Sequence, residues 1–154
     1  MDWELIKNVI LFIGGFIGLL TFIKGILEYS HQIKQKRVIQ FIEMRRRFKE
    51  NEKFRQICDL CEIDNDKLID IPLGDRRNYA GFLEEVALMM NSGLIRKNVV
   101  FYFFGWYALT CWHSKNFWVD MGQESNYWDL FRDFAHQMEE IEKSFQYRRS
   151  DFEI

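Results

Sequence analysis

The stretch that decides how this chain is organised is residues 8–23, NVILFIGGFIGLLTFI, which is strongly apolar and carries no charge. Lys7 and Lys24 flank it, Trp3 precedes it and Tyr29 follows it. A helix from Trp3 to Tyr29 is about 39 Å long at 1.5 Å per residue, close to the ~40–45 Å of a bilayer with its headgroups. Aromatic residues at both ends are typical of membrane interfaces. We therefore expect a transmembrane anchor over residues 1–33.

Two other kinds of segment share this apolar character. A secretory signal peptide has a positively charged start and a small-residue cleavage site, whereas this stretch starts with Asp2 and Glu4 and is followed by KGILEYSHQIK. A buried core helix is the second alternative, because the uncharged run is shorter than the usual span of about 20 residues.

Small residues recur along one side of this helix. Gly14, Gly18, Thr21 and Gly25 follow each other at spacings of four, three and four. Small residues let helix backbones approach closely, so the pattern predicts self-association, either as a dimer or as a ring that lines a pore. We define the predicted seam as seven residues: Lys7, Leu11, Gly14, Gly18, Thr21, Gly25 and Glu28.

The segment that follows is basic. Between Lys34 and Arg55 nine lysines and arginines face three glutamates. The positive-inside rule then places this flank in the cytoplasm and the short N-terminus outside. The basic neck is defined by Lys34, Lys36, Arg37, Arg45, Arg46 and Arg47. Three roles fit this basic neck. It could fix the topology and contact anionic headgroups, it could form a basic vestibule above a ring of helices, or it could contact nucleic acid.

The remaining residues, 34–154, form one predicted cytoplasmic helical domain. Proline occurs once, at Pro72, and 15 of the 154 residues are phenylalanine, which favours helices around an aromatic core. Helical spacing of apolar residues predicts an all-α fold with these segments: 2–49, 51–62, Asp75 (as N-cap) to Met90, 96–112, and a last helix that begins near Ser125 (as N-cap), with residues 148–154 as a loose tail. The predicted buried positions are Phe54, Ile57, Cys58 and Cys61 in the second segment, Tyr79, Phe82, Leu83, Val86 and Met90 in the third, and Tyr127, Leu130, Phe131, Phe134, Met138, Ile141 and Phe145 in the last.

The segment 99–112, VVFYFFGWYALTCW, is apolar almost all round. Its uncharged length of 15 residues, from Asn98 to Trp112, is short for a membrane span. We therefore expect the buried central helix of the bundle.

Few residues suggest catalysis. Arg132 and His136 lie four residues apart on the last helix, where histidine could act as acid or base and arginine could hold phosphate. They are weak candidates, since a solvated helix face carries the same pattern. Cys58 and Cys61 resemble half a zinc site, with Cys111 and His113 as further ligands. Because Cys111 and His113 are two residues apart and point to different sides of a helix, we expect buried structural thiols instead. We expect no metal and no cofactor.

Two resemblances follow from the order of these elements. The segments 37–60 and 76–112 resemble a family of small bacterial single-span membrane proteins of unknown function, through Phe82, Glu84, Glu85, Ala87, Gly93, Ile95, Gly105 and Trp112. In architecture the chain is also similar to the membrane-pore accessory proteins of type VI-B, RNA-targeting CRISPR systems. That similarity implies a HEPN-like helical bundle. The spacing of Arg132 and His136 departs from the HEPN nuclease motif, so it implies no ribonuclease activity.

Together these observations predict an oligomeric, single-pass protein of the bacterial inner membrane, which forms pores or perturbs the membrane in antiphage defence and is not an enzyme. Its expected partners are the bilayer, further copies of itself and an RNA-guided effector acting upstream. Two alternatives remain: a membrane-tethered HEPN-type ribonuclease, and a scaffold or signalling protein that binds through exposed aromatic residues.

Overall fold

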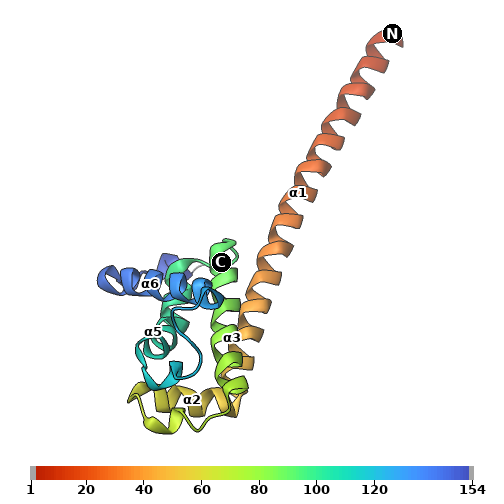
Figure 1. The fold of residues 1–154 in the computed structure, drawn as a ribbon. Helices are drawn as coiled ribbons and strands as arrows, with labels where there is room; N and C mark the ends of the chain where they lie inside the picture. The colour runs from red at the N-terminus through yellow and green to blue at the C-terminus, as the bar shows by residue number, and fades with distance from the viewer. Residues whose placement is uncertain (1–2, 153–154) are drawn as a thin grey trace. The chain divides into compact units, whose positions relative to one another are not determined.

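The computed structural model describes residues 3–152, and within this range the side chains at 5–7, 9–11, 13 and 34 lie outside the description. All regular structure in the described residues is helical, which confirms the all-α class. The chain divides into two compact units, residues 1–40 and residues 41–154. The elements are α1 (Trp3–Glu50), α2 (Glu52–Glu62), η1 (Asp66–Leu68), α3 (Leu73–Asn91), α4 (Lys97–Val100), η2 (Phe101–Gly105), α5 (Trp106–His113), η3 (Asn116–Trp118), η4 (Asn126–Trp128), α6 (Asp129–Ser144) and η5 (Arg149–Phe152) (Figure 1).

The first unit is a single helical stretch, the N-terminal part of α1. Our expectation that it crosses a membrane is wrong, because no helix in the described part of the chain is long and apolar enough to do so. The uncharged run between Lys7 and Lys24 has only 16 residues, against the roughly 20 that a span requires. The predicted anchor over residues 1–33 is therefore corrected to an apolar helix over its described part, which begins at Trp3. The predicted placement in the inner membrane, with the N-terminus outside and a cytoplasmic C-terminal domain, is corrected with it.

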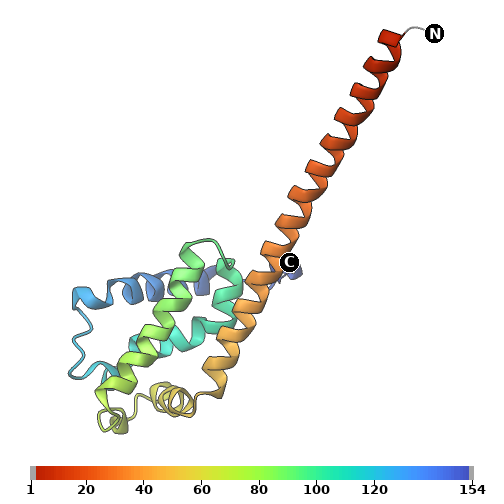
Figure 2. The ribbon, with the colours of Figure 1, turned by 90° about the vertical axis from the view of Figure 1, so that its right-hand side faces the viewer.

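The second unit holds the hydrophobic core. In it α3 and α5 lie between α2 at one end and α6 at the other, with α3 running from the α2 end toward α6 (Figures 1 and 2). Phe48, near the end of α1, lies at the centre of an aromatic cluster and contacts five other rings, those of Phe54, Tyr79, Phe82, Phe104 and Tyr107. Edge-to-face and tilted contacts of this kind add to the burial of apolar area.

The second helix confirms the sequence prediction closely. Asn51 accepts hydrogen bonds from the backbone N–H groups of Lys53 and Phe54 and so caps α2. The predicted apolar face is buried: Phe54, Ile57, Cys58 and Cys61. Helix α3 also buries its predicted face, but Asp75 does not cap it. Pro72 precedes the first turn, and the Asp75 carboxylate accepts from Lys53 Nζ at 2.8 and 2.9 Å.

The aromatic run 99–112 is helical but not uniform. A π-helical turn, η2, separates α4 from α5. Phe104, Ala108 and Cys111 are buried, whereas Tyr102 and Trp106 are exposed. The expectation of a helix buried all round is therefore wrong. π-Turns place an extra residue within a helix and are often found at functional sites.

Buried polar groups join the connections between helices. Arg76 is 2% exposed and donates to the carbonyl oxygens of Ile71, Phe117 and Val119. Burial lowers the pKa of Arg76, and the nearby Asp120 partly opposes that effect. One guanidinium group therefore satisfies carbonyls from two separate connections, residues 63–72 and 114–125.

The C-terminal part departs from expectation at both of its ends. Ser125 caps η4 and not α6, and Tyr127, predicted to be buried, is 91% exposed. The tail predicted to be loose is attached: Arg96 donates to the Ser150 carbonyl at 2.7 Å, and Asn98 donates to the Asp151 carboxylate at 2.7 Å.

Candidate functional site

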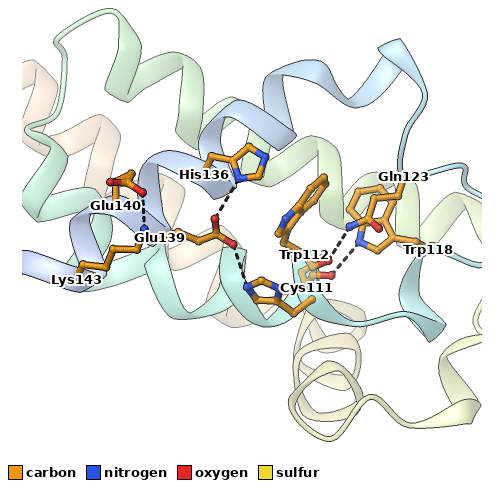
Figure 3. A network of polar contacts seen from close by, with 9 residues as sticks. Cys111, Trp112, Trp118, Gln123, His136, Glu139, Glu140 and Lys143 are labelled. Carbon is orange, nitrogen blue, oxygen red and sulfur yellow. Dashed lines mark hydrogen bonds and ion pairs between the residues drawn. The ribbon is translucent and has the colours of Figure 1, made fainter.

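A carboxylate shared by two histidines forms the most developed polar cluster on the second unit. His113 ends α5, and one turn of α6 carries both His136 and Glu139. His113 Nε2 lies 3.2 Å from one oxygen of Glu139, and His136 Nδ1 lies 3.1 Å from the other (Figure 3). The Glu139 side chain is 28% exposed, whereas more than half of each histidine side chain is open to solvent. The His136 ring also meets Trp112 edge-on at 5.7 Å.

This arrangement can orient two imidazole rings, as a carboxylate does in acid–base sites. It does not assemble a metal centre, since no cluster of three ligand side chains in the described residues can hold a metal ion. The sequence singled out His136 but missed its partners. The contact of His136 with Glu139 could have been predicted from their spacing of three residues on one helix. The contact of His113 with Glu139 could not, because it depends on the packing of α5 against α6.

Arg132, the other predicted catalytic residue, lies apart from this cluster. Its guanidinium donates to Asp129 at 2.7 Å and to the Gln123 carbonyl at 3.3 Å, with Glu124 at 3.9 Å. Its Nε is buried without a hydrogen-bond partner. Arg132 and His136 therefore share a helix but serve different neighbours.

The cysteines are buried thiols and not zinc ligands. The sulfur of Cys58 lies 3.2 Å from the hydroxyl of Tyr79 inside the core. Burial raises the pKa of Cys58 to about 12 and raises those of Tyr79 and Cys111 as well. Because the thiolate is the form that binds metals and attacks electrophiles, burial disfavours such chemistry at Cys58 and Cys111.

The predicted seam lies on the first unit. A Cβ atom added at Gly14, Gly18 or Gly25 would meet no atom within 4 Å, so these positions are open along α1. Thr21 Oγ1 donates to the Ile17 carbonyl at 2.9 Å, which satisfies its hydroxyl within the helix. Glu28 is exposed, while the side chains of Lys7 and Leu11 lie outside the described part of the chain.

The predicted basic neck is divided between the two units. Lys36 and Arg37 are exposed on the first unit, and the side chain of Lys34 lies outside the description. On the second unit, Arg46 pairs with Glu43 at 2.6 Å and Arg47 with Glu85 at 3.5 Å. Arg45 instead places its guanidinium 4.3 Å from the centre of the Phe103 ring.

Two clefts of about 370 Å³ each share Tyr102 and Trp106 as lining residues. One cleft is also lined by Thr110, His113 and Glu142, next to the Glu139 cluster. The other is lined also by Arg45 and Lys49. Both volumes are at the lower end of the range for small-ligand sites.

Comparison with known proteins adds no relative: no family model matches the chain, and no curated protein or solved structure matches it significantly. The resemblances stated from the sequence accordingly stay predictions.

Proposed function

We propose that this protein is a self-assembling scaffold, in which the apolar part of α1 associates with further copies of itself and gathers the helical units of residues 41–154. The observation that carries the proposal is the exposure of this helix. In the described residues, nine large apolar side chains between Phe12 and Leu27 are each at least 44% exposed. Exposed apolar surface of this extent marks an interaction site.

The amount of apolar surface is sufficient to support association. Burying a large apolar side chain contributes roughly 1.5–3 kcal/mol, so covering about half of these nine gives on the order of 10 kcal/mol per chain. That is comparable to the roughly 4–15 kcal/mol lost when two molecules are ordered against each other. At about 3.6 residues per turn the nine side chains cover well over half of the helix circumference, and the strip of Gly14, Gly18, Thr21 and Gly25 lies on the remaining side. A helix with apolar surface this wide is ordinarily covered from more than one side. An assembly of several copies covers it better than a dimer does.

The glycine seam supports close approach between the helices. Gly14 and Gly18 leave open space along the helix, and the Thr21 hydroxyl is already satisfied, so a dry contact leaves no polar group without a partner. The second unit contributes none of the nine side chains, so its own fold does not depend on the association.

The other predicted functions have less support in the geometry. The pore stays a prediction, and no helix in the described residues is long and apolar enough to cross a membrane. The ribonuclease alternative stays a prediction, because Arg132 and His136 hold separate partners and converge on no common position.

The proposal is tested by replacing Gly14 and Gly18 together with leucine. A Cβ atom added at either position meets no atom within 4 Å, and leucine favours helix more than glycine does, so the protomer itself should stay intact. We expect the double variant to lower the molar mass of the full chain by a factor of at least two in light scattering. The substitution adds apolar surface, so a smaller mass would identify close helix packing and not general stickiness as the cause of assembly.

Gly15→Leu is the matched control. Gly15 is equally open but lies outside the seam. It should leave the assembly at its original mass. A monomeric wild-type chain at micromolar concentration would contradict the proposal, and so would an equal effect of the Gly15 and the Gly14/Gly18 substitutions.

A further inference from the structure

A groove on the second unit combines exposed aromatic rings with free cations. It has a volume of about 370 Å³ and is lined by the last turns of α1 and by the π-turn region: Arg45, Phe48, Lys49, Tyr102, Phe103, Phe104, Trp106 and Tyr107. None of these residues is acidic. An anionic ligand would therefore enter the groove without meeting a carboxylate in its lining.

The two cations of the groove differ from the basic residues around them. Arg45 and Lys49 have no carboxylate partner in the described part of the chain. Every other basic side chain between residues 41 and 55 has one: Arg46 with Glu43 and Glu50, Arg47 with Glu85, Lys53 with Asp75 and Arg55 with Glu52. Arg45 and Lys49 are four residues apart and lie on one face of α1. The contact of Arg45 with the Phe103 ring holds its guanidinium at the groove without neutralising it.

The aromatic wall is also unusual. Tyr102 and Trp106 are each about half exposed, although they belong to the most apolar segment of the second unit. Trp106 meets Tyr107 edge-on at 5.0 Å, and Tyr102 meets Phe103 edge-on at 5.0 Å. Packing on a neighbouring ring limits the movement of each side chain while part of its surface stays in solvent. Aromatic rings held in this way are suited to stacking with a planar ligand.

We propose that this groove binds single-stranded nucleic acid, with bases stacking on Trp106 and Tyr102 and phosphates held by Arg45 and Lys49. Single-strand sites combine these two elements, cations along the backbone and aromatic rings beneath the bases. An acidic peptide would use the cations but has no regular supply of planar groups for the rings. The inference goes beyond the proposed scaffold function and does not rest on it, since every residue involved belongs to the second unit.

The neighbouring cleft gives the strand a continuing path. It shares Tyr102 and Trp106 with the groove and offers Thr110 and His113 beyond them. Glu142 also lines this cleft, so the favourable path for a phosphate backbone ends before the His113–Glu139 pair.

The test is fluorescence anisotropy of a labelled ten-nucleotide oligouridine RNA, and of the matching thymidine DNA, titrated with the full-length protein at several salt concentrations. Trp106→Ala should weaken binding about tenfold or more, because stacking on one ring is lost. Lys49→Gln should weaken binding and reduce the slope of log K against log salt by about 0.7, as expected for one lost phosphate contact with a single strand.

Matched controls exist on the same unit. Tyr127→Ala removes a more exposed ring and Lys67→Gln a more distant cation, and both should bind like the wild type. Circular dichroism melting checks the fold, and if Trp106→Ala is unfolded, the salt dependence of Lys49→Gln decides alone, because Lys49 is an exposed side chain. Absence of binding, or unchanged binding by folded Trp106→Ala and Lys49→Gln, would overturn the proposal. A decaglutamate peptide that displaces the oligonucleotide, and whose own binding is weakened as much by Trp106→Ala, would also overturn it. That result would assign the groove to an acidic protein partner.

Discussion

At the scale of single residues, Gly105 shows how closely the aromatic segment is packed. It lies at the end of the π-turn, and a Cβ atom placed there would come 2.6 Å from Cδ2 of Phe101. The Phe101 ring in turn lies 4.7 Å from that of Phe145, so it has a neighbour on its far side as well. The glycine is needed for space and not for backbone conformation, since it has ordinary helical angles.

We expect Gly105→Ala to destabilise the protein by about 1–3 kcal/mol, the usual cost of overpacking a core. The gain in helix propensity from alanine, up to about 1 kcal/mol, is too small to offset this. Chemical denaturation measures the difference. Introducing Phe101→Leu in the same chain should recover part of the loss, because the smaller side chain leaves room for the new methyl group. If the changes in the free energy of unfolding caused by the two substitutions simply add in the double variant, the two residues do not compete for space.

Single residues were also where sequence reasoning succeeded and failed most visibly. The start of the second helix was predicted to within one residue: Asn51, expected as its first residue, is its cap and accepts from backbone N–H groups two and three residues away. Asp75 was predicted as a cap and is instead an ion-pair partner of Lys53, 22 residues earlier. Nothing local to Asp75 indicates that contact.

At the scale of elements, the connections between helices stabilise one another through Asp64. Its carboxylate accepts from Ser114 Oγ at 2.7 Å and from the Asn116 backbone N–H at 2.9 Å, and so joins the segment after α2 to the segment after α5. Desolvation raises its pKa, but the hydrogen bonds from Asn116 and Ser114 outweigh it, and the net pKa is lowered. Asp64 also has a positive φ of 46°.

Asp64→Asn tests this link through pH. A carboxylate with a lowered folded-state pKa contributes stability that is present above the unfolded value of 3.8 and is lost as pH falls through the folded value. Asparagine tolerates the left-handed backbone and keeps one acceptor oxygen, so only the charge is removed. We expect a loss of about 1 kcal/mol at pH 7. In thermal melts the difference in stability between Asp64→Asn and the wild type should shrink as the pH falls below about 4. A difference that stays constant with pH would show that the lost charge is not its cause.

Elements were predicted best where one face is polar. The pattern of α2 identifies its buried face because exposed and buried positions differ in chemistry. The run 99–112 lacks that contrast, and its sequence could not show that Tyr102 and Trp106 face outward. The cluster of His113, His136 and Glu139 was missed for a related reason, since it depends on how α5 and α6 pack together.

At the scale of the whole molecule, the buried core and the exposed apolar surface that we propose for association belong to different parts of the chain. Every buried residue in the described part lies between Met44 and Met138, and the nine exposed apolar side chains lie between Phe12 and Leu27. The sequence could not separate these roles, because apolar residues look alike whether they form a core or a contact. It therefore predicted a membrane span from length and composition, which the described helix does not support.

A chain that begins at Arg37, and so keeps one helical turn before the second unit, should fold and be monomeric. Its core is complete, so we expect cooperative melting in circular dichroism and a molar mass of one chain in light scattering, where the full-length protein is larger. Failure of this shorter chain to melt cooperatively would show that residues 3–36 contribute to the core.

The π-turn also constrains how this protein can change over evolutionary time. A turn of this kind differs from regular α-helix by one additional residue, and each residue rotates the following side chains by about 100°. Deleting one residue between Phe101 and Gly105 would restore an ordinary helix while turning Trp106 away from the groove and Cys111 away from the core. We therefore expect the length of this segment to matter as much as its composition, and insertions or deletions to be tolerated in the surrounding connections before they are tolerated here.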